Sequence, residues 1–292
     1  MAAMRRRRGY LLLVIASGGF GCVHPILKPK DGLTTMKQAT RVVPTNGEVQ
    51  VAIASRLIDQ PAGSDYLSRG LWRETTSPIS HELTTLLAIN GIRIGVLGAT
   101  RPLEFQTLMT SEASVLDPMI RTTSLGRPRV LPVNGPLPSC ELEVSNRIDS
   151  ELEGRAYAAA ECGLQITPMP SVDGRMKLRC ELQIQHGQRQ PFLQPSADGS
   201  YLARKDQRPT EQFGSFAWEI TFDREDALIV GATEEPVKRL GEAFFFSGGG
   251  ERPRQRVLVI QGGWADSLGE ASPVKASRSP AARAGSLVVR KE

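Results

Sequence analysis

The sequence has few of the residues that most enzymes use for catalysis. Histidine occurs three times and cysteine four times in 292 residues, and aromatic residues make up 5%. The patterns G-x-S-x-G, H-E-x-x-H and G-x-x-x-x-G-K-[ST] do not occur, which excludes the common signatures of serine hydrolases, zinc proteases and P-loop nucleotide-binding enzymes. No two cysteines have C-x-x-C spacing, so a zinc or thioredoxin-like site has no support. We therefore expect no catalytic residue, no metal site and no cofactor.

The apolar stretch near the start is too short to span a membrane. Tyr10–Gly21 has 12 residues, whereas a membrane-spanning helix needs about 20. Arg5–Arg8 precede this stretch, and small residues lead from it to Cys22, which is the order of an export signal. The segment resembles the bacterial lipoprotein signal, in which such a cysteine is lipidated. We predict a signal peptide over residues 1–22, a lipid anchor on Cys22, and a place at the periplasmic or outer-membrane face of the cell envelope.

Two other interpretations of this leader stay open. Gly19 and Phe20 depart from the usual residues of the lipidation motif, and small residues also allow ordinary secretory cleavage after Gly18 or Gly21. The run Arg7–Leu11 also looks like a twin-arginine signal, which implies export of a folded chain. All three interpretations place the protein outside the cytoplasm.

The apparent basicity of the chain comes from its two ends. The net charge is +5, but Arg5–Arg8 supply +4 and residues 269–292 supply +3, which leaves −2 for the residues between. A nucleic-acid-binding domain carries its basic residues on the folded part. We therefore predict a membrane and an envelope protein as partners, and no nucleic acid.

If Cys22 carries lipid, three cysteines remain, at positions 140, 162 and 180. A hairpin that turns at Asp173–Gly174 sets Cys162 opposite about residue 185, so Cys162 lies about 16 Å out of register with Cys180. That exceeds the reach of a disulfide. We predict two buried free thiols at 162 and 180, and a pair that involves Cys140 stays open.

Hydrophobic periodicity predicts a change of architecture along the chain. After a flexible tether over 23–47, we expect a strand near Val49–Leu57, a helix capped by Ser80 with a stop at Asn90–Gly91, a strand from Ile92 and a helix after Pro102. From about residue 121, prolines and two-residue alternation predict strands, most clearly over Met176–Ile184. The predicted fold class is α+β: an N-terminal β-α-β-α unit over 48–120 joined to a predominantly antiparallel sheet or sandwich over 121–268, followed by a disordered basic tail over 269–292.

Four places are considered as possible sites. His81 begins a helix and His186 follows a strand, and neither has an acidic residue or cysteine at metal spacing, so both are interpreted as surface residues. The adjacent residues Phe244, Phe245 and Phe246 must place at least one large ring on each face of a strand. We interpret them as a buried core strand, with a partner-binding or membrane-dipping edge as the alternative. The glycine-rich run Ser247–Gly250 is interpreted as a hairpin loop.

Two resemblances to known families follow from these residues. Three features of Asp226–Ile260 resemble the end of the core domain of bacterial secretins of type II and III secretion systems. They are the apolar strand Leu228–Gly231, a Pro-x-x-x-Leu-Gly then Phe pattern (Pro236, Leu240, Gly241, Phe244, Phe245) and the closing strand Arg256–Ile260. The stretch that includes "LWRETTSPISHELTTLLAINGIRIGVLG" resembles a group of exported planctomycete lipoproteins of unknown function. These resemblances imply a β-rich envelope module that assembles with other proteins.

The sequence thus favours a non-catalytic, lipid-anchored envelope protein that acts as an interaction or assembly module, with a secretion system as the setting that the resemblance implies. The alternative is an exported hydrolase or a small-ligand binding protein with a site near His186 or His81.

Overall fold

The computed structural model describes residues 49–171, 173, 175–195, 200–234, 237–248 and 253–264. All of them belong to one compact unit, Val43–Glu292. The predicted signal peptide, the lipidation site Cys22, the tether and the basic tail lie outside the described residues. Within the part that is described, no helix is both long and apolar enough to cross a membrane.

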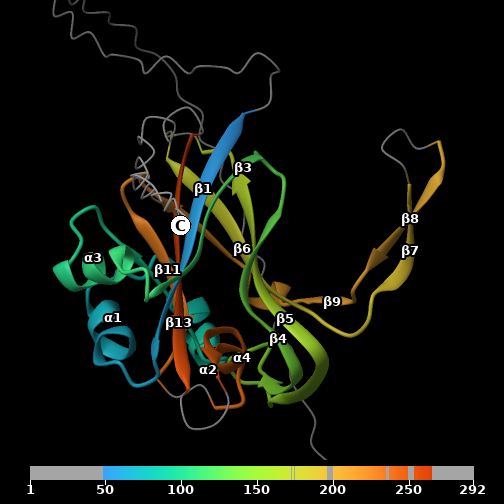
Figure 1. The fold of residues 1–292 in the computed structure, drawn as a ribbon, viewed down its shortest axis with the longest axis horizontal. Coiled ribbons are helices and arrows are strands. Elements are labelled where there is room, and N and C mark those ends of the chain that lie inside the picture. The colour runs from blue at the N-terminus through green and yellow to red at the C-terminus, as the bar shows by residue number, and fades with distance from the viewer. Residues whose placement is uncertain are drawn as a thin grey trace, which may run out of the picture. The chain divides into compact units, whose positions relative to one another are not determined.

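Sheet A is antiparallel and takes its strands from both ends of the described chain (Figure 1). Its order is β2 (Ile92–Leu97), β11 (Ala227–Ala232), β13 (Arg254–Trp264), β1 (Gln50–Pro61) and β3 (Val115–Ser124), with the short β12 (Phe246–Ser247) also paired to β13. Strands β11 and β13 therefore stand between β2 and β1. The elements of the predicted β-α-β-α order are present, but a separate N-terminal unit is not confirmed, because its two strands are joined only through strands from the end of the chain.

Sheet B is built from consecutive hairpins. Its order is β10 (Trp218–Phe222), β6 (Met176–Gln185), β5 (Glu153–Met169) and β4 (Arg129–Val144), with β9 (Thr210–Gln212) paired to β6. Strand β6 alternates as its sequence predicts, with Met176, Leu178, Cys180, Leu182 and Ile184 all buried. A third, two-stranded sheet joins β7 (Gln190–Pro195) to β8 (Leu202–Gln207).

Short helices pack against the sheets in two groups. The first group is the π-helical turn η1 (Tyr66–Gly70), α1 (Leu71–Arg73) and α3 (Leu103–Thr110), and the second is α2 (His81–Ile89) and α4 (Leu240–Phe245), with the 3₁₀ turn η2 (Gly214–Phe216) before β10. Ser80 caps α2 as predicted, because its hydroxyl accepts a hydrogen bond from the Leu83 amide at 3.3 Å. Gly91 follows with a φ of 78°, which is the left-handed conformation that ends a helix.

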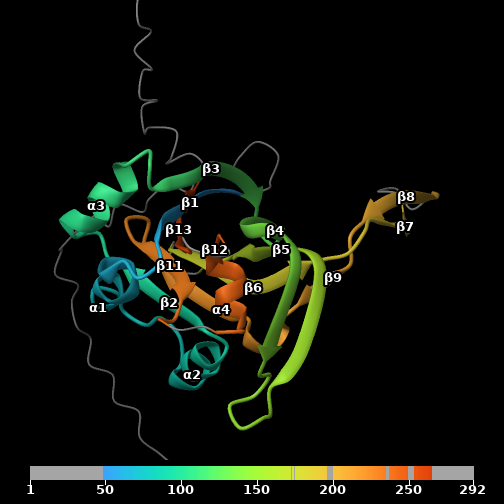
Figure 2. The ribbon, with the colours of Figure 1, turned by 60° about the horizontal axis from the view of Figure 1, so that its bottom comes forward.

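Two apolar layers hold these elements together. On one face of sheet A, Ile58, Ile229, Val257 and Val259 pack with residues from η1, α1 and α3, including Leu67, Leu71 and Phe105. On the other face, Leu228, Val230, Leu258 and Ile260 pack with the buried face of sheet B and with α2 and α4. Figures 1 and 2 show α1 and α3 on the side of sheet A away from β4, β5 and β6. Strand β11 is buried at every position because both of its faces are covered.

Helix α3 is held on sheet A by an aromatic side chain. The helix begins after Pro102 as expected, but Leu103 is 79% exposed, whereas Phe105 is fully buried and anchors the helix on sheet A.

Candidate functional site

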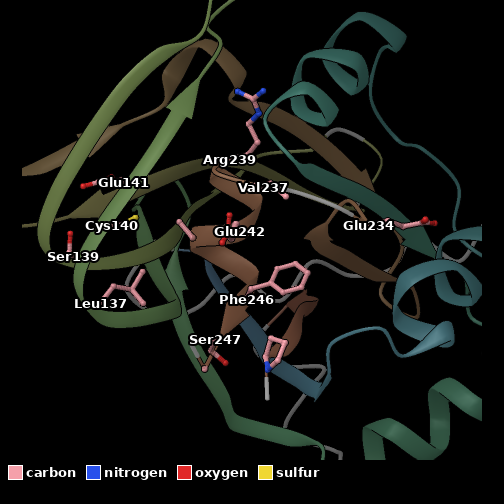
Figure 3. Close-up of a pocket in the computed structure, with 13 residues that line it drawn as sticks. Leu137, Ser139, Cys140, Glu141, Glu234, Val237, Arg239, Glu242, Phe246 and Ser247 are labelled. Atoms are coloured by element: carbon pink, nitrogen blue, oxygen red, sulfur yellow. The ribbon is translucent and has the colours of Figure 1, made fainter. Parts of the chain in front are cut away.

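A cleft lies between the last part of strand β4 and the segment that carries α4 and β12 (Figure 3). Its volume is about 660 Å³, which is in the size range of ligand sites in proteins. The strand β4 lines one side with Leu137, Ser139, Cys140 and Glu141, and Figure 3 shows Glu242 and Phe246 across from them. The other lining residues are Glu234, Val237, Arg239, Ala243, Ser247, Gly248 and Pro253.

Buried polar contacts fix α4 beside the start of this cleft. The side-chain amide of Asn134, on β4, donates 2.7 Å hydrogen bonds to the carbonyl oxygens of Ala243 and Phe246. Its own carbonyl oxygen accepts a hydrogen bond from Arg256 Nη1 at 2.8 Å. Arg256 also pairs with the buried carboxylate of Asp59 on β1, as does Arg254. Asn134 thus connects β4 of sheet B with the segment of α4 and, through Arg256 on β13, with sheet A.

The edge of β4 is unpaired where it faces the cleft. Strand β4 is the last strand of sheet B, and from Leu137 to Val144 its pairing with β5 is regular. The Glu143 amide donates to the Lys238 carbonyl oxygen at 2.7 Å, so the backbone of Glu143 points away from β5. Because both polar backbone groups of every second residue in an antiparallel strand point to the same side, those of Ser139 and Glu141 also point away from β5.

The described structure records no backbone partner on that outer side for Ser139 or Glu141. The segment that holds α4 is bound to β4 at Asn134 and at Glu143, and the intervening residues 137–141 line the cleft. An unpaired strand edge offers N–H and C=O groups for another extended chain to join. The cleft is therefore suited to an extended peptide.

The cleft carries an excess of carboxylates. Its ionised residues are Glu141, Glu234, Glu242 and Arg239, and Arg239 is already paired with Glu143 at 2.9 Å. Glu234 lies 3.4 Å from Arg69 and 4.0 Å from Arg93 on the outer rim. Among the described residues, no lysine or arginine side chain is paired with Glu141 or Glu242, and the Glu242 carboxylate accepts a hydrogen bond from the Lys238 backbone amide at 2.5 Å. This charge favours a cationic ligand over an anionic one.

The cysteine of the cleft does not have the properties of a nucleophile. Cys140 is buried, and burial, together with the nearby charge of Glu242, raises the pKa of its thiol. A raised pKa keeps the thiol protonated at neutral pH, whereas the thiolate is the reactive form. Cys140 instead contributes an apolar wall to the cleft.

Of the predicted site residues, Phe244 and Phe245 lie in a helix and only Phe246 lies in a strand. Phe244 and Phe245 are the last residues of α4, and both are fully buried in the core. Phe246 follows in β12, is half-buried and lines the cleft. Neither Phe244 nor Phe245 is on a surface in this structure, and Phe246 is the one of the three that a partner in the cleft can contact.

The two histidines are not brought together. His81 is exposed at the start of α2. His186 is half-buried after β6, with its ring 5.1 Å from that of Tyr157, whose hydroxyl donates to Glu211 at 2.7 Å. Neither histidine lines this cleft or the second cavity described below. Within the described residues, no group of three or more His, Cys, Asp or Glu side chains could hold a metal ion.

A second cavity, of about 400 Å³, lies on the other side of Asn134. Its lining includes Asp117, Glu161, Cys162 and Arg256. Arg256 is bound to Asp59 and Asn134, and Glu161 is paired with Arg208 at 2.6 Å. Burial raises the pKa of Cys162. Arg256 and Glu161 are thus used in contacts within the fold.

Sequence reasoning missed the edge of β4. Pro132, Pro136 and Pro138 fall in the region where the sequence predicts strands, but their position at a sheet edge is not predicted. Proline lacks a backbone N–H and is largely confined to edge strands and bulges, so three prolines within one long strand were the available signal. The register of β4 against β5 shifts on both sides of Asn134, which lies between the first two of these prolines.

Comparisons with known proteins give only distant structural matches. No family model matches the chain, and no curated protein matches it. Among solved structures, the secretin-domain β-barrel of InvG from the Salmonella SPI-1 injectisome matches with a TM-score of 0.25 and 10% identity, over 79% of this chain and 66% of that chain. The pilotin–secretin complex AspS–GspD of ETEC matches with a TM-score of 0.16 and 10% identity, over 74% of this chain and 48% of that chain.

The matched structures are of secretins, which is also the family that Asp226–Ile260 resembles in sequence. At TM-scores this low, however, the likeness carries no argument about the function of this chain. The chain also spans only about two thirds of the first match and about half of the second.

Proposed function

We propose that this protein is an exported, lipid-anchored and non-catalytic module of the cell envelope that binds a partner polypeptide at the free edge of β4. The observation that carries the proposal is the unpaired backbone of Ser139 and Glu141 beside a cleft of about 660 Å³. Export and anchoring rest on the sequence order Arg5–Cys22. The sequence resemblance of residues 226–260 to secretins is the reason to look for the partner among envelope proteins, secretion components included.

The mode of binding follows from the backbone geometry. A partner segment that lies along residues 137–141 exchanges main-chain hydrogen bonds with Ser139 and Glu141, and these bonds supply affinity with little dependence on sequence. The side chains of Leu137, Val237 and Phe246 then select apolar groups, and the carboxylates select positive charge. No covalent chemistry is required of the cleft.

A site-specific crosslink tests this proposal in the native envelope. A photoreactive residue replaces Val237, which is 69% exposed on the far side of the cleft. We expect it to give one major adduct with an envelope protein. Ser139→Pro removes an outward N–H without removing a ladder hydrogen bond, so this change should reduce the adduct at least tenfold, whereas Ser139→Ala should leave it unchanged.

Equal behaviour of the two Ser139 variants would contradict the proposal. If Ser139→Pro and Ser139→Ala give equal adduct yields from a protein with unchanged thermal stability, the edge of β4 is not the binding element. A second photoreactive residue at Ile120, which is 72% exposed on β3 of sheet A, serves as the site control.

A further inference from the structure

The cleft sets three requirements on its occupant. The outward N–H and C=O groups of Ser139 and Glu141 require an extended backbone. The walls formed by Leu137, Ala243 and Phe246 require apolar side chains. The exposed carboxylates of Glu141 and Glu242 favour positive charge, because no lysine or arginine side chain among the described residues is paired with them and Glu242 accepts only the backbone amide of Lys238.

One segment of the chain outside the described residues meets all three requirements. Ser286–Lys291 reads Ser-Leu-Val-Val-Arg-Lys. It holds the only run of three consecutive large aliphatic residues in 265–292, and valine strongly favours extended structure. Two cations follow the apolar run directly. The rest of 265–292 is dominated by Ser, Pro, Ala and charged residues.

We propose that Ser286–Lys291 of the same chain binds in this cleft as an added strand on the edge of β4. Alternate side chains of an added strand point to opposite faces. A register that places Leu287 and Val289 on the face of Cys140 and Phe246 places Arg290 on the face of Glu141. The apolar and charged requirements are then met together.

The connection is long enough for this arrangement. Strand β13 runs from Arg254, next to the cleft residue Pro253, to Trp264, and at about 3.3 Å per residue its far end lies about 33 Å away. Residues 265–285 can extend to about 70 Å. The segment therefore reaches the cleft with about twofold slack, and its binding is intramolecular.

This inference rests on the proposed function, because it uses the same edge. A tethered segment acts at an effective concentration near the millimolar range, so it shields Ser139 and Glu141 until a partner with higher affinity displaces it. The segment would also cover an exposed strand edge, which is otherwise prone to association with other chains.

The test uses the full chain and a variant that ends at Gly285. The probe is a fluorescent peptide with the sequence of residues 284–292, and its binding is measured by anisotropy. We expect the peptide to bind the shortened chain at least tenfold more tightly than the full chain, in which the site is already occupied. Hydrogen exchange at the amides of Ser139 and Glu141 should be at least tenfold slower in the full chain.

Matched variants identify the contacts. In the shortened chain, Ser139→Pro should weaken peptide binding at least tenfold, and Ser139→Ala should leave it unchanged. Glu141→Lys should weaken binding severalfold and reduce its dependence on salt. Glu82→Lys, an equal change of charge on exposed α2, is the control.

Three results would overturn the inference: no binding of the peptide to the shortened chain, equal binding to both chains, or equal exchange at Ser139 and Glu141. Protection that grows with protein concentration would overturn it as well, since it would identify a second copy as the occupant. The proposed function is judged separately. It survives these outcomes if Ser139→Pro still reduces the Val237 adduct, and it fails if that adduct is unchanged.

Discussion

Asn90 shows how a single buried amide can join a helix to the end of an edge strand. It ends α2, and its side-chain nitrogen donates 2.9 Å hydrogen bonds to the carbonyl oxygens of Leu86 and Ser145. Its side-chain oxygen accepts a 2.9 Å hydrogen bond from the Ser145 amide. Ser145 follows the last residue of β4, so these bonds fix the end of the edge strand against the helix.

Asn90→Ala should therefore lower the free energy of unfolding by about 3 kcal/mol, because two buried backbone groups of Ser145 lose their partner. Chemical denaturation measures this change. Asn146→Ala is the control, since its side-chain contacts with Glu153 and Ser215 are exposed, and it should cost less than about 0.5 kcal/mol. Equal losses for the two variants would contradict the role assigned to Asn90.

Gly241 allows helix α4, which lines the cleft, to pack closely against the backbone that follows α2. A Cβ atom at this position would lie 1.9 Å from the carbonyl oxygen of Gly91, at the start of β2. The Gly241 amide also donates to the Asn90 carbonyl oxygen at 3.0 Å. Helix α4 thus packs against the backbone that follows α2 at a distance that only glycine permits.

Gly241→Ala should destabilise the protein by at least about 2 kcal/mol, because the backbone of α4 or of Gly91 must move. It should also expose the amides of residues 240–246 to hydrogen exchange. Gly154→Ala is the matched change in a strand, where the added Cβ meets nothing within 4 Å. A thermal midpoint for Gly241→Ala as high as that of Gly154→Ala would refute this packing argument.

At the scale of elements, the hairpin of β5 and β6 follows its sequence closely. Its predicted turn sets Cys162 opposite about residue 185, and the observed partner is Ile184. Cys162 and Cys180 are buried and form no disulfide, as predicted, and neither does Cys140, for which the sequence left a pairing open. Burial raises the pKa of all three thiols.

These thiols give the stability of sheet B a defined pH dependence. A thiol in the unfolded chain ionises near pH 8.5, whereas the buried thiols stay protonated, so the folded state binds more protons above that pH. The contribution of the buried thiols to the free energy of unfolding is therefore fully present below about pH 8 and is lost as the pH rises. Urea unfolding between pH 7 and 9.5 should show a decline that approaches about 1.4 kcal/mol per pH unit for each thiol.

The variant with both Cys162→Ala and Cys180→Ala should have a lower stability at pH 7 because of the cavities it creates, but a shallower decline above pH 8. The prediction is tested by the slope of the free energy of unfolding against pH and not by its value at any single pH. Parallel curves for the two proteins would show that the thiols do not cause the pH dependence.

Helix α4 is the element that the sequence did not predict. Three consecutive phenylalanines favour a strand by propensity, yet Phe244 and Phe245 end a six-residue helix. The Asn134 amide binds the carbonyl oxygens of Ala243 and Phe246 at the end of that helix. A partner 109 residues away thus satisfies backbone groups that a strand would pair in a ladder.

At the scale of the whole molecule, the proposed role requires that the edge of β4 works at a membrane surface. Cys22 lies outside the described residues, so its lipidation stays a prediction from the sequence.

Cys22→Ser should release the protein from the membrane fraction, because it removes the predicted site of acylation. Mass spectrometry of the mature protein should find a lipid-modified Cys22 as the first residue in the unchanged sequence. A mature chain that begins at Gly19 and remains soluble would contradict the anchor, although export would still hold.

The sequence alone determined those features that depend on neighbouring residues. Alternation of apolar residues determined β6 and its buried face, and the spacing of Ser80, Leu86 and Leu87 with the stop at Asn90–Gly91 determined α2. Each of these depends on side-chain periods and on caps within a few residues.

Only the tertiary structure decided where these elements meet. It placed β11 and β13 between β2 and β1, left the outer edge of β4 unpaired, and joined Asn134 to α4. The physical reason is that a hydrophobic pattern specifies which face of an element is buried, whereas hydrogen-bond partners far apart in the sequence decide which edge is covered and which remains open.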